Sequence, residues 1–244
     1  GSAEREVDKD VMRAKFESIM EGSYKNKLFE QCGATVVSHE HLEADDCIAL
    51  TLKHIRNTYT DSKCYIIASD HDYFQLLNEN VFLYNLKYKQ VNTEKNSYGN
   101  AKKDLFIKCV TGDTSDNIFS AYPGARKKGT RNKIGMIEAY EDKDTGGFNW
   151  NNFMLQRWTD HNGDEHTVRE DYERNKTLID LHAQPVELKV EFVQTIADAS
   201  KPKTISGVGI NFLKWCGEWD LQNLSKAPDE MASILNKAYP QEAS

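Results

Sequence analysis

Long apolar runs, paired cysteine motifs and an excess of basic residues are all missing from this chain of 244 residues. No apolar stretch approaches the roughly 20 residues needed to span a bilayer, and no signal peptide is visible, which argues against membrane and secreted proteins. The five cysteines are odd in number, widely spaced and without a Cys-x-x-Cys motif. We therefore expect reduced core cysteines of a cytosolic protein. The net charge of −7 by itself argues against a nucleic-acid partner.

The overall composition is that of an ordinary globular protein. Hydrophobic residues make up 39% of the chain and aromatic residues 10%. The length fits one sizeable domain, or a core domain with a small appendage, and is enough to bury a real core. The opening Gly1-Ser2 resembles a tag-cleavage scar and is left out of the argument.

Acidic residues gather in three short clusters, and these are the most informative feature of the chain. Their members are Glu43, Asp45 and Asp46, then Asp70 and Asp72, then Asp113 and Asp116. Carboxylates repel one another, so a fold that brings them together needs cations to neutralise them. Oxygen-only ligands select hard ions such as Mg²⁺ and Mn²⁺, and pairs of such ions are the usual machinery for cutting phosphodiesters. These seven carboxylates also carry as much negative charge as the whole net balance.

The order of apolar patterns predicts an α/β fold. Helices are expected over 8–32, from Asp45 or Asp46 onward, over 72–77 and over 101–110, and strands over 34–38, 64–68 and 81–86. Strands separated by helices indicate a parallel sheet covered on both faces. Sites in such sheets form beyond the carboxyl ends of the strands. The first two acidic clusters each follow an expected strand, so we expect them to converge.

The second half of the chain reads as mostly helical. Helices are expected over 132–142, 170–182, 186–198, 207–217 and 228–238, with an Asn162-Gly163 turn that could close a small hairpin. Five cations also fall within eight residues of one another: Arg126, Lys127, Lys128, Arg131 and Lys133. A basic stripe beside an acidic metal site suits a nuclease, while the plainer interpretation is a solvated loop.

Each acidic motif also has a purely structural interpretation. Asp45-Asp46 could cap a helix, and Asp70-His71-Asp72 could be a turn before the next helix. The segment 112–117 has the composition of a polar loop, but it lacks the ligand spacing and closing Glu of an EF-hand. The pair His39 and His41 has no further cysteine or histidine at ligand spacing, so a zinc site is not supported. Three such motifs in this order favour a shared site over three separate caps.

The three motifs together resemble the flap endonuclease and 5′–3′ exonuclease family of PIN-like 5′ nucleases. They read Glu-Ala-Asp-Asp over 43–46, Ile-Ala-Ser-Asp-His-Asp over 67–72 followed by Phe-Gln-Leu-Leu over 74–77, and Gly-Asp-Thr-Ser-Asp-Asn-Ile over 112–118. The likeness is greatest to the bacterial polymerase-associated 5′ nuclease and the phage ribonuclease H branch. It covers about residues 10–200, including the pattern Tyr172-x-x-Asn175-x-x-Leu178.

The resemblance implies a fold and a set of roles. It implies a PIN-like nuclease core over 3–117 and a helical DNA-binding region over 118–244. Glu43, Asp45, Asp46 and Asp70 would serve mainly a first metal, and Asp72, Asp113 and Asp116 a second. The ions would be Mg²⁺ or Mn²⁺. A helix-hairpin-helix over 123–134, with a bound K⁺, would grip duplex DNA. Because the family's compact Gly-x-Gly hairpin is replaced here, direct phosphate contacts by Arg126, Lys127, Lys128, Arg131 and Lys133 are our hypothesis for this chain.

One family feature is absent. No Asp-Gly-Asn motif precedes residue 43, so the chain resembles a member without the N-terminal strand. The expected substrates are DNA flaps, nicks or RNA primers, and the expected partners are replication proteins or a separate N-terminal segment. A catalytically weak DNA-binding module is the main alternative, and a PIN-type ribonuclease a weaker one. The expected location is the cytoplasm of a bacterial or phage-infected cell, or a eukaryotic nucleus.

Overall fold

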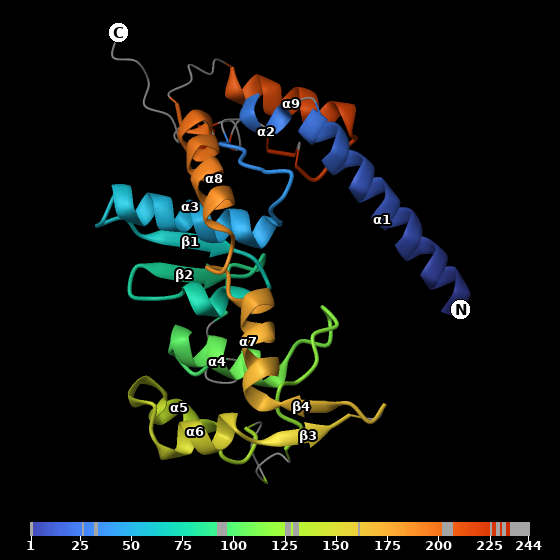
Figure 1. Ribbon diagram of the computed structural model, residues 1–244. Coiled ribbons are helices and arrows are strands. Elements are labelled where there is room, and N and C mark those ends of the chain that lie inside the picture. The colour runs from blue at the N-terminus through green and yellow to red at the C-terminus, as the bar shows by residue number, and fades with distance from the viewer. Residues whose placement is uncertain are drawn as a thin grey trace. The chain divides into compact units, whose positions relative to one another are not determined.

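A computed structural model describes residues 2–234 with internal gaps (Figure 1). The gaps are at 26, 32–33, 92–96, 125–127, 129–131, 161, 202–206, 225, 228–229 and 231–232. Contacts divide the chain into two compact units, His39–Val193 and Gly1–Ser38 with Gln194–Ser244. Each unit has its own packing and is described by itself.

A parallel pair of strands lies at one end of the unit His39–Val193. Strands β1 (Cys64–Ile67) and β2 (Val81–Tyr84) pair in register from Cys64 opposite Val81 to Ile67 opposite Tyr84, joined through the short helix η1 (Asp72–Leu76). Helix α3 (Ala44–Thr58) contributes the buried Ala49 to the core that this sheet shares with η1. The predicted α/β class with a parallel sheet is therefore confirmed.

A second core of the same unit is built from helices. They are α4 (Ala101–Thr111), α5 (Met136–Glu141), η2 (Lys143–Thr145), α6 (Phe148–Met154) and α7 (Val168–Ile179). Phe106 of α4 packs in one cluster with Met136, Phe153 and Tyr172. Residues on both sides of position 117 thus share one core. The division into 3–117 and 118–244 stays a prediction.

The turn predicted at Asn162-Gly163 does close a hairpin. Strands β3 (Arg157–Thr159) and β4 (Glu165–Thr167) pair antiparallel, and the Gly163 amide donates to the Asp160 carbonyl over 3.2 Å. Gly163 has a φ of 92°, a backbone region that favours glycine.

The other unit is helical. It holds α1 (Ser2–Lys25), α2 (Leu28–Gln31) and α9 (Val208–Glu218), and α8 (Val186–Ala199) crosses from one unit into the other. The Trp215 indole donates to Ser23 Oγ over 2.8 Å, so α9 is tied to α1. Among the described residues, no helix has both the length and the apolar character required to cross a membrane.

Two of the element predictions need correction. Residues 34–38 form no strand, because within the described residues β1 and β2 pair only with each other and this segment has no strand partner. The helix expected over 8–32 is interrupted after Lys25 and continues only as the short α2. The helix expected over 228–238 falls largely outside the described residues.

Candidate metal centre

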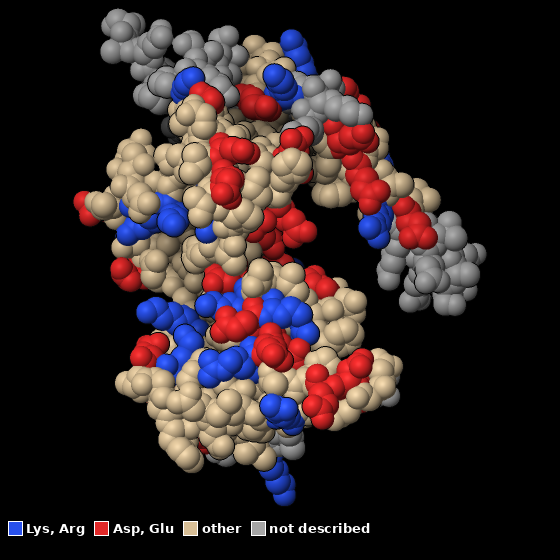
Figure 2. Space-filling view, in the orientation of Figure 1, with Lys and Arg blue, Asp and Glu red and all other residues tan. Residues whose placement is uncertain are grey.

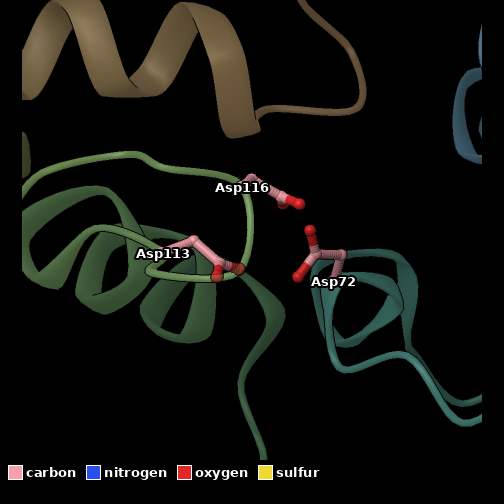
Figure 3. A group of neighbouring side chains, drawn as sticks. All are labelled: Asp72, Asp113 and Asp116. Carbon is pink, nitrogen blue, oxygen red and sulfur yellow. The ribbon is translucent and has the colours of Figure 1, made fainter.

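Three carboxylates from two acidic motifs face a common space. Asp72, Asp113 and Asp116 each offer one oxygen, and these oxygens all lie within 4.8 Å of one another (Figure 3). Searched over the described residues, the chain has no second group of three His, Cys, Asp or Glu side chains this close. One residue of the second motif and two of the third therefore lie close together, whereas the convergence expected from the strands was that of the first and second motifs.

The backbone around β1 and η1 sets the position of Asp72. The strand ends at Ile67, and the Asp72 amide donates to Asp70 Oδ1 over 2.9 Å, closing a turn that starts η1. Tyr73 and Phe74 then bury their rings in the core. Asp72 is thus fixed at the start of a short helix whose next two side chains are anchored.

A tight loop after α4 carries the other two carboxylates. Asp113 and Ile118 exchange backbone hydrogen bonds of 2.8 and 2.7 Å. Gly112, which ends α4, has a φ of 72°, and a Cβ atom there would lie 2.4 Å from the Ile118 carbonyl oxygen. Only glycine fits this close approach without a shift of the backbone. The loop 113–118 therefore turns back sharply and presents Asp113 and the exposed Asp116 on one side.

A lysine that the motif analysis missed lies among these carboxylates. Lys108 Nζ is 2.7 Å from Asp113 Oδ2 and also contacts Asp72. The ammonium group, followed by the Ser115 hydroxyl, holds the pKa of Asp113 well below its usual range. A sequence signal did exist, because Lys108 and Gly112 are four residues apart and therefore lie on the same face of the expected helix, next to the third acidic motif.

The donor set suits a hard divalent cation. Carboxylate oxygens are the ligands that Mg²⁺ and Mn²⁺ prefer. Three carboxylates and one ammonium leave two net negative charges, which one divalent ion would balance. Asp72 and Asp113 also line an open depression of about 420 Å³, together with Asp70. The residues present therefore fit one such ion, while the prediction of two ions stays a prediction.

The first acidic motif has a different geometry. The Glu43 amide donates to Asp46 Oδ2 over 3.2 Å in a capping box at the start of α3. Asp46 Oδ1 also accepts a bond of 2.6 Å from Gln184 Nε2. The helix-capping interpretation of this motif is thus present in the structure, and Asp46 has both oxygens engaged.

Asp45 of the first motif contacts a tyrosine hydroxyl group. The Tyr73 hydroxyl donates to Asp45 Oδ1. Burial first, then the bond to Asp45 and the charges of Asp45 and Asp70, raise the pKa of Tyr73 well above its usual value. The structure therefore pairs Asp45 with Tyr73, and Asp45 is not a member of the group of three carboxylates. A metal-binding role for Glu43, Asp45, Asp46 and Asp70 stays a prediction.

The predicted phosphate-binding lysines and arginines are only partly described. Arg126, Lys127 and Arg131 lie outside the described residues, whereas Lys128 is exposed. Lys133 is half-buried, and its ammonium donates to Ser120 Oγ over 2.6 Å and contacts the Tyr122 carbonyl. On the visible face, basic and acidic side chains mix over α4 and α7 (Figure 2). Contact of these residues with phosphate stays a prediction.

Comparisons with known proteins give a family match that covers the first two acidic motifs. Residues 4–104 match the family model described as the 5′-3′ exonuclease, N-terminal resolvase-like domain. DNA polymerase I of Rhizobium leguminosarum is 32% identical over 113 residues, which are 45% of this chain and 10% of that protein.

Two solved phage structures are similar to the chain. A bacteriophage T5 flap endonuclease complexed with DNA and metal ions matches with 17% identity and a TM-score of 0.46, over 66% of this chain and 61% of that one. A T5 protein co-crystallised with metal ions matches with 18% identity and a TM-score of 0.45, over 67% and 62%. The chain thus spans a small part of the polymerase and about three fifths of each phage chain. Residues 4–104 are thus similar to the N-terminal resolvase-like domain of 5′-3′ exonucleases.

Proposed function

We propose that this protein is a divalent-metal-dependent 5′ nuclease that hydrolyses phosphodiester bonds. The observation that carries the proposal is the meeting of Asp72, Asp113 and Asp116 in a chain whose residues 4–104 match the 5′-3′ exonuclease family model. Clustered negative charge next to a polyanionic substrate is unfavourable, so a protein that only binds nucleic acid gains nothing from it. A divalent cation held by these carboxylates neutralises their charge and so removes this repulsion.

The residues of this chain have separable roles in the proposed site. Asp72, Asp113 and Asp116 would hold one ion, and Asp70, which lines the same depression, would share in its hydration. When bound, such ions activate water and stabilise charge at the phosphodiester. Lys108 offsets the repulsion between Asp72 and Asp113, so the site stays assembled before an ion arrives.

The proposed substrate is DNA with a 5′ end at a flap, a nick or an RNA primer. The family description and the polymerase relative support a 5′-directed role in replication or repair. The exposed Lys128, with Arg126, Lys127 and Arg131, would contact phosphates, with Mg²⁺ or Mn²⁺ as cofactor. The whole polymerase is much longer than the matched segment, so its partners are also proposals for this chain.

A DNA-binding module with weak catalysis is the second candidate. Two hydrogen bonds favour it, that of Asp45 with Tyr73 and that of Asp46 with Gln184. They give these carboxylates of the first motif a structural role in place of metal binding. A site with three gathered carboxylates could then bind an ion but cut slowly.

Cleavage of a 5′-labelled flap duplex separates the two candidates. We expect cutting with Mg²⁺, none with EDTA, and a loss of at least about 10–100-fold in Asp72→Asn and Asp116→Asn, the loss seen when even outer-shell partners of a metal site are removed. Glu79→Gln, an exposed acid in the same unit, is the matched control and should cut normally. Binding without cutting would replace the nuclease with the binding module.

A further inference from the structure

Two amide side chains, of which Asn175 is fully buried and Gln75 partly exposed, connect helix α7 to both elements that carry the gathered carboxylates. Asn175 lies inside α7 with none of its surface exposed, and Gln75 lies in η1, three residues after Asp72. Both make hydrogen bonds to backbone groups that are distant in the sequence. Asn175 reaches the loop of Asp113 and Asp116, and Gln75 reaches the end of α7.

The Asn175 amide satisfies two backbone carbonyls at the edges of the loop 113–118. Its Nδ2 donates to the Cys109 carbonyl over 3.0 Å and to the Phe119 carbonyl over 2.7 Å. Cys109 is in the last turn of α4, where carbonyls have no partner within the helix, and the Asp113 amide that would have reached it bonds Ile118 instead. One side chain thus fixes both ends of the loop against α7.

Gln75 makes the matching connection from the other element. Its Nε2 donates to the Ile179 carbonyl over 3.0 Å, and its Oε1 accepts from the Leu181 amide over 2.9 Å. Ile179 ends α7, so these are again backbone groups that the helix leaves free. Asn175 and Ile179 are four residues apart and therefore lie on the same face of α7.

We propose that Asn175 and Gln75 are positioning residues. Their hydrogen bonds attach the two carboxylate-bearing segments to the same helix, α7, and so keep Asp72 opposite Asp113 and Asp116. The inference rests on the proposed metal site and extends it to residues that touch no ion. Carboxylates on two separate segments repel one another, and Lys108 offsets only part of that repulsion. Two-point amide bonds to one rigid helix resist the separation and keep the oxygens within reach of one cation.

Gln184 extends the same arrangement to the first acidic motif. Its Nε2 bonds Asp46 Oδ1 and, over 2.7 Å, the Leu181 carbonyl. The segment from Asn175 to Gln184 therefore contacts all three acidic motifs or their direct neighbours.

The test measures Mn²⁺ binding without DNA by calorimetry in Asn175→Ala and Gln75→Met, and compares it with Val168→Ala. Val168 is fully buried in the same helix but far along it from the loop contacts, so its variant controls for lost packing alone. We expect the dissociation constant for Mn²⁺ to rise at least about tenfold in the first two variants and to stay unchanged in the control. Equal weakening in all three variants, or none in the first two, would overturn the proposal.

Hydrogen exchange of the metal-free proteins provides a readout that does not depend on ion binding or cleavage. Exchange over 112–120 should accelerate in Asn175→Ala and exchange over 70–77 in Gln75→Met, each beyond any change in Val168→Ala. If the wild type binds no Mn²⁺ and cuts no DNA, the proposed function fails. Faster hydrogen exchange in these two segments would still support the positioning role of Asn175 and Gln75. Unchanged hydrogen exchange in both segments would refute the positioning role of Asn175 and Gln75, even if the protein is an active nuclease.

Discussion

Replacing Lys108 by Met removes the positive charge between Asp72 and Asp113 and keeps a side chain of similar length. Without a bound metal, three carboxylates whose oxygens lie within 4.8 Å would then have no cation among them. We expect the metal-free protein to lose stability and the variant to bind divalent ions more tightly than the wild type.

The size of the effect follows from the geometry. At the 2.7 Å that separates Lys108 Nζ from Asp113 Oδ2, the Coulomb energy is roughly 1.5 kcal/mol at a dielectric constant of about 80 and roughly 6 kcal/mol at about 20. The two side chains are 22% and 17% exposed, so solvent screening and desolvation reduce the net value. Hydrogen bonds to charged groups contribute about 1.5–3 kcal/mol net. We therefore expect the free energy of unfolding to fall by about 1.5–3 kcal/mol at neutral pH.

Urea unfolding followed by circular dichroism measures this in EDTA and in saturating Mn²⁺. A ligand that binds the folded state stabilises it in proportion to the logarithm of its concentration over its dissociation constant. The variant site has one more net negative charge, so Mn²⁺ should stabilise Lys108→Met more than the wild type. Lys102→Met, an exposed change on the same helix, is the control and should shift stability by less than about 0.5 kcal/mol.

Two results would refute the reasoning about Lys108. One is equal stability of variant and wild type in EDTA, which would mean that the ammonium does not offset carboxylate repulsion. The other is an equal or smaller gain from Mn²⁺ in the variant, which would mean that Lys108 and the ion do not neutralise the same charges.

Three further predictions concern individual side chains. Lys108 and Ser115 depress the folded-state pKa of Asp113, so the ionised Asp113 side chain stabilises the fold fully above the usual carboxyl pKa of about 4, and this stabilisation is lost as the pH falls below it. The difference in unfolding free energy between wild type and Asp113→Asn should therefore shrink from pH 6 to about pH 3. A constant difference would contradict this. Burial raises the pKa of the Cys109 thiol to about 12, so mass spectrometry should find it unalkylated by iodoacetamide at pH 8 until urea unfolds the protein; rapid native alkylation would be inconsistent with that burial. The Asn100 side chain caps α4 by accepting from the Lys103 amide over 3.0 Å, so Asn100→Ala should cost about 1 kcal/mol in urea unfolding and Asn100→Asp much less; equal losses would exclude the cap as the cause.

The sequence predicted local elements well where apolar patterns were continuous. The strands near 64 and 81, the helix starting near 101 and the hairpin at Asn162-Gly163 all form within a few residues of the expected bounds. The strand expected over 34–38 was wrong because strand formation depends on a neighbouring edge, which a local pattern does not report. The four described cysteines are free, and three of them are buried, as expected.

For the site, the sequence by itself determined which carboxylates were candidates, since residue type and motif order limit the chemistry to oxygen ligands for hard cations. The sharp turn after α4 is a finding of the structure, where a Cβ atom at Gly112 would lie 2.4 Å from the Ile118 carbonyl oxygen. Only the tertiary structure decided that Asp72, Asp113 and Asp116 meet while Asp46 binds Gln184. The physical reason is that Lys108, Gln75 and Asn175 act through contacts between distant segments, and long-range distances are set by packing against α7.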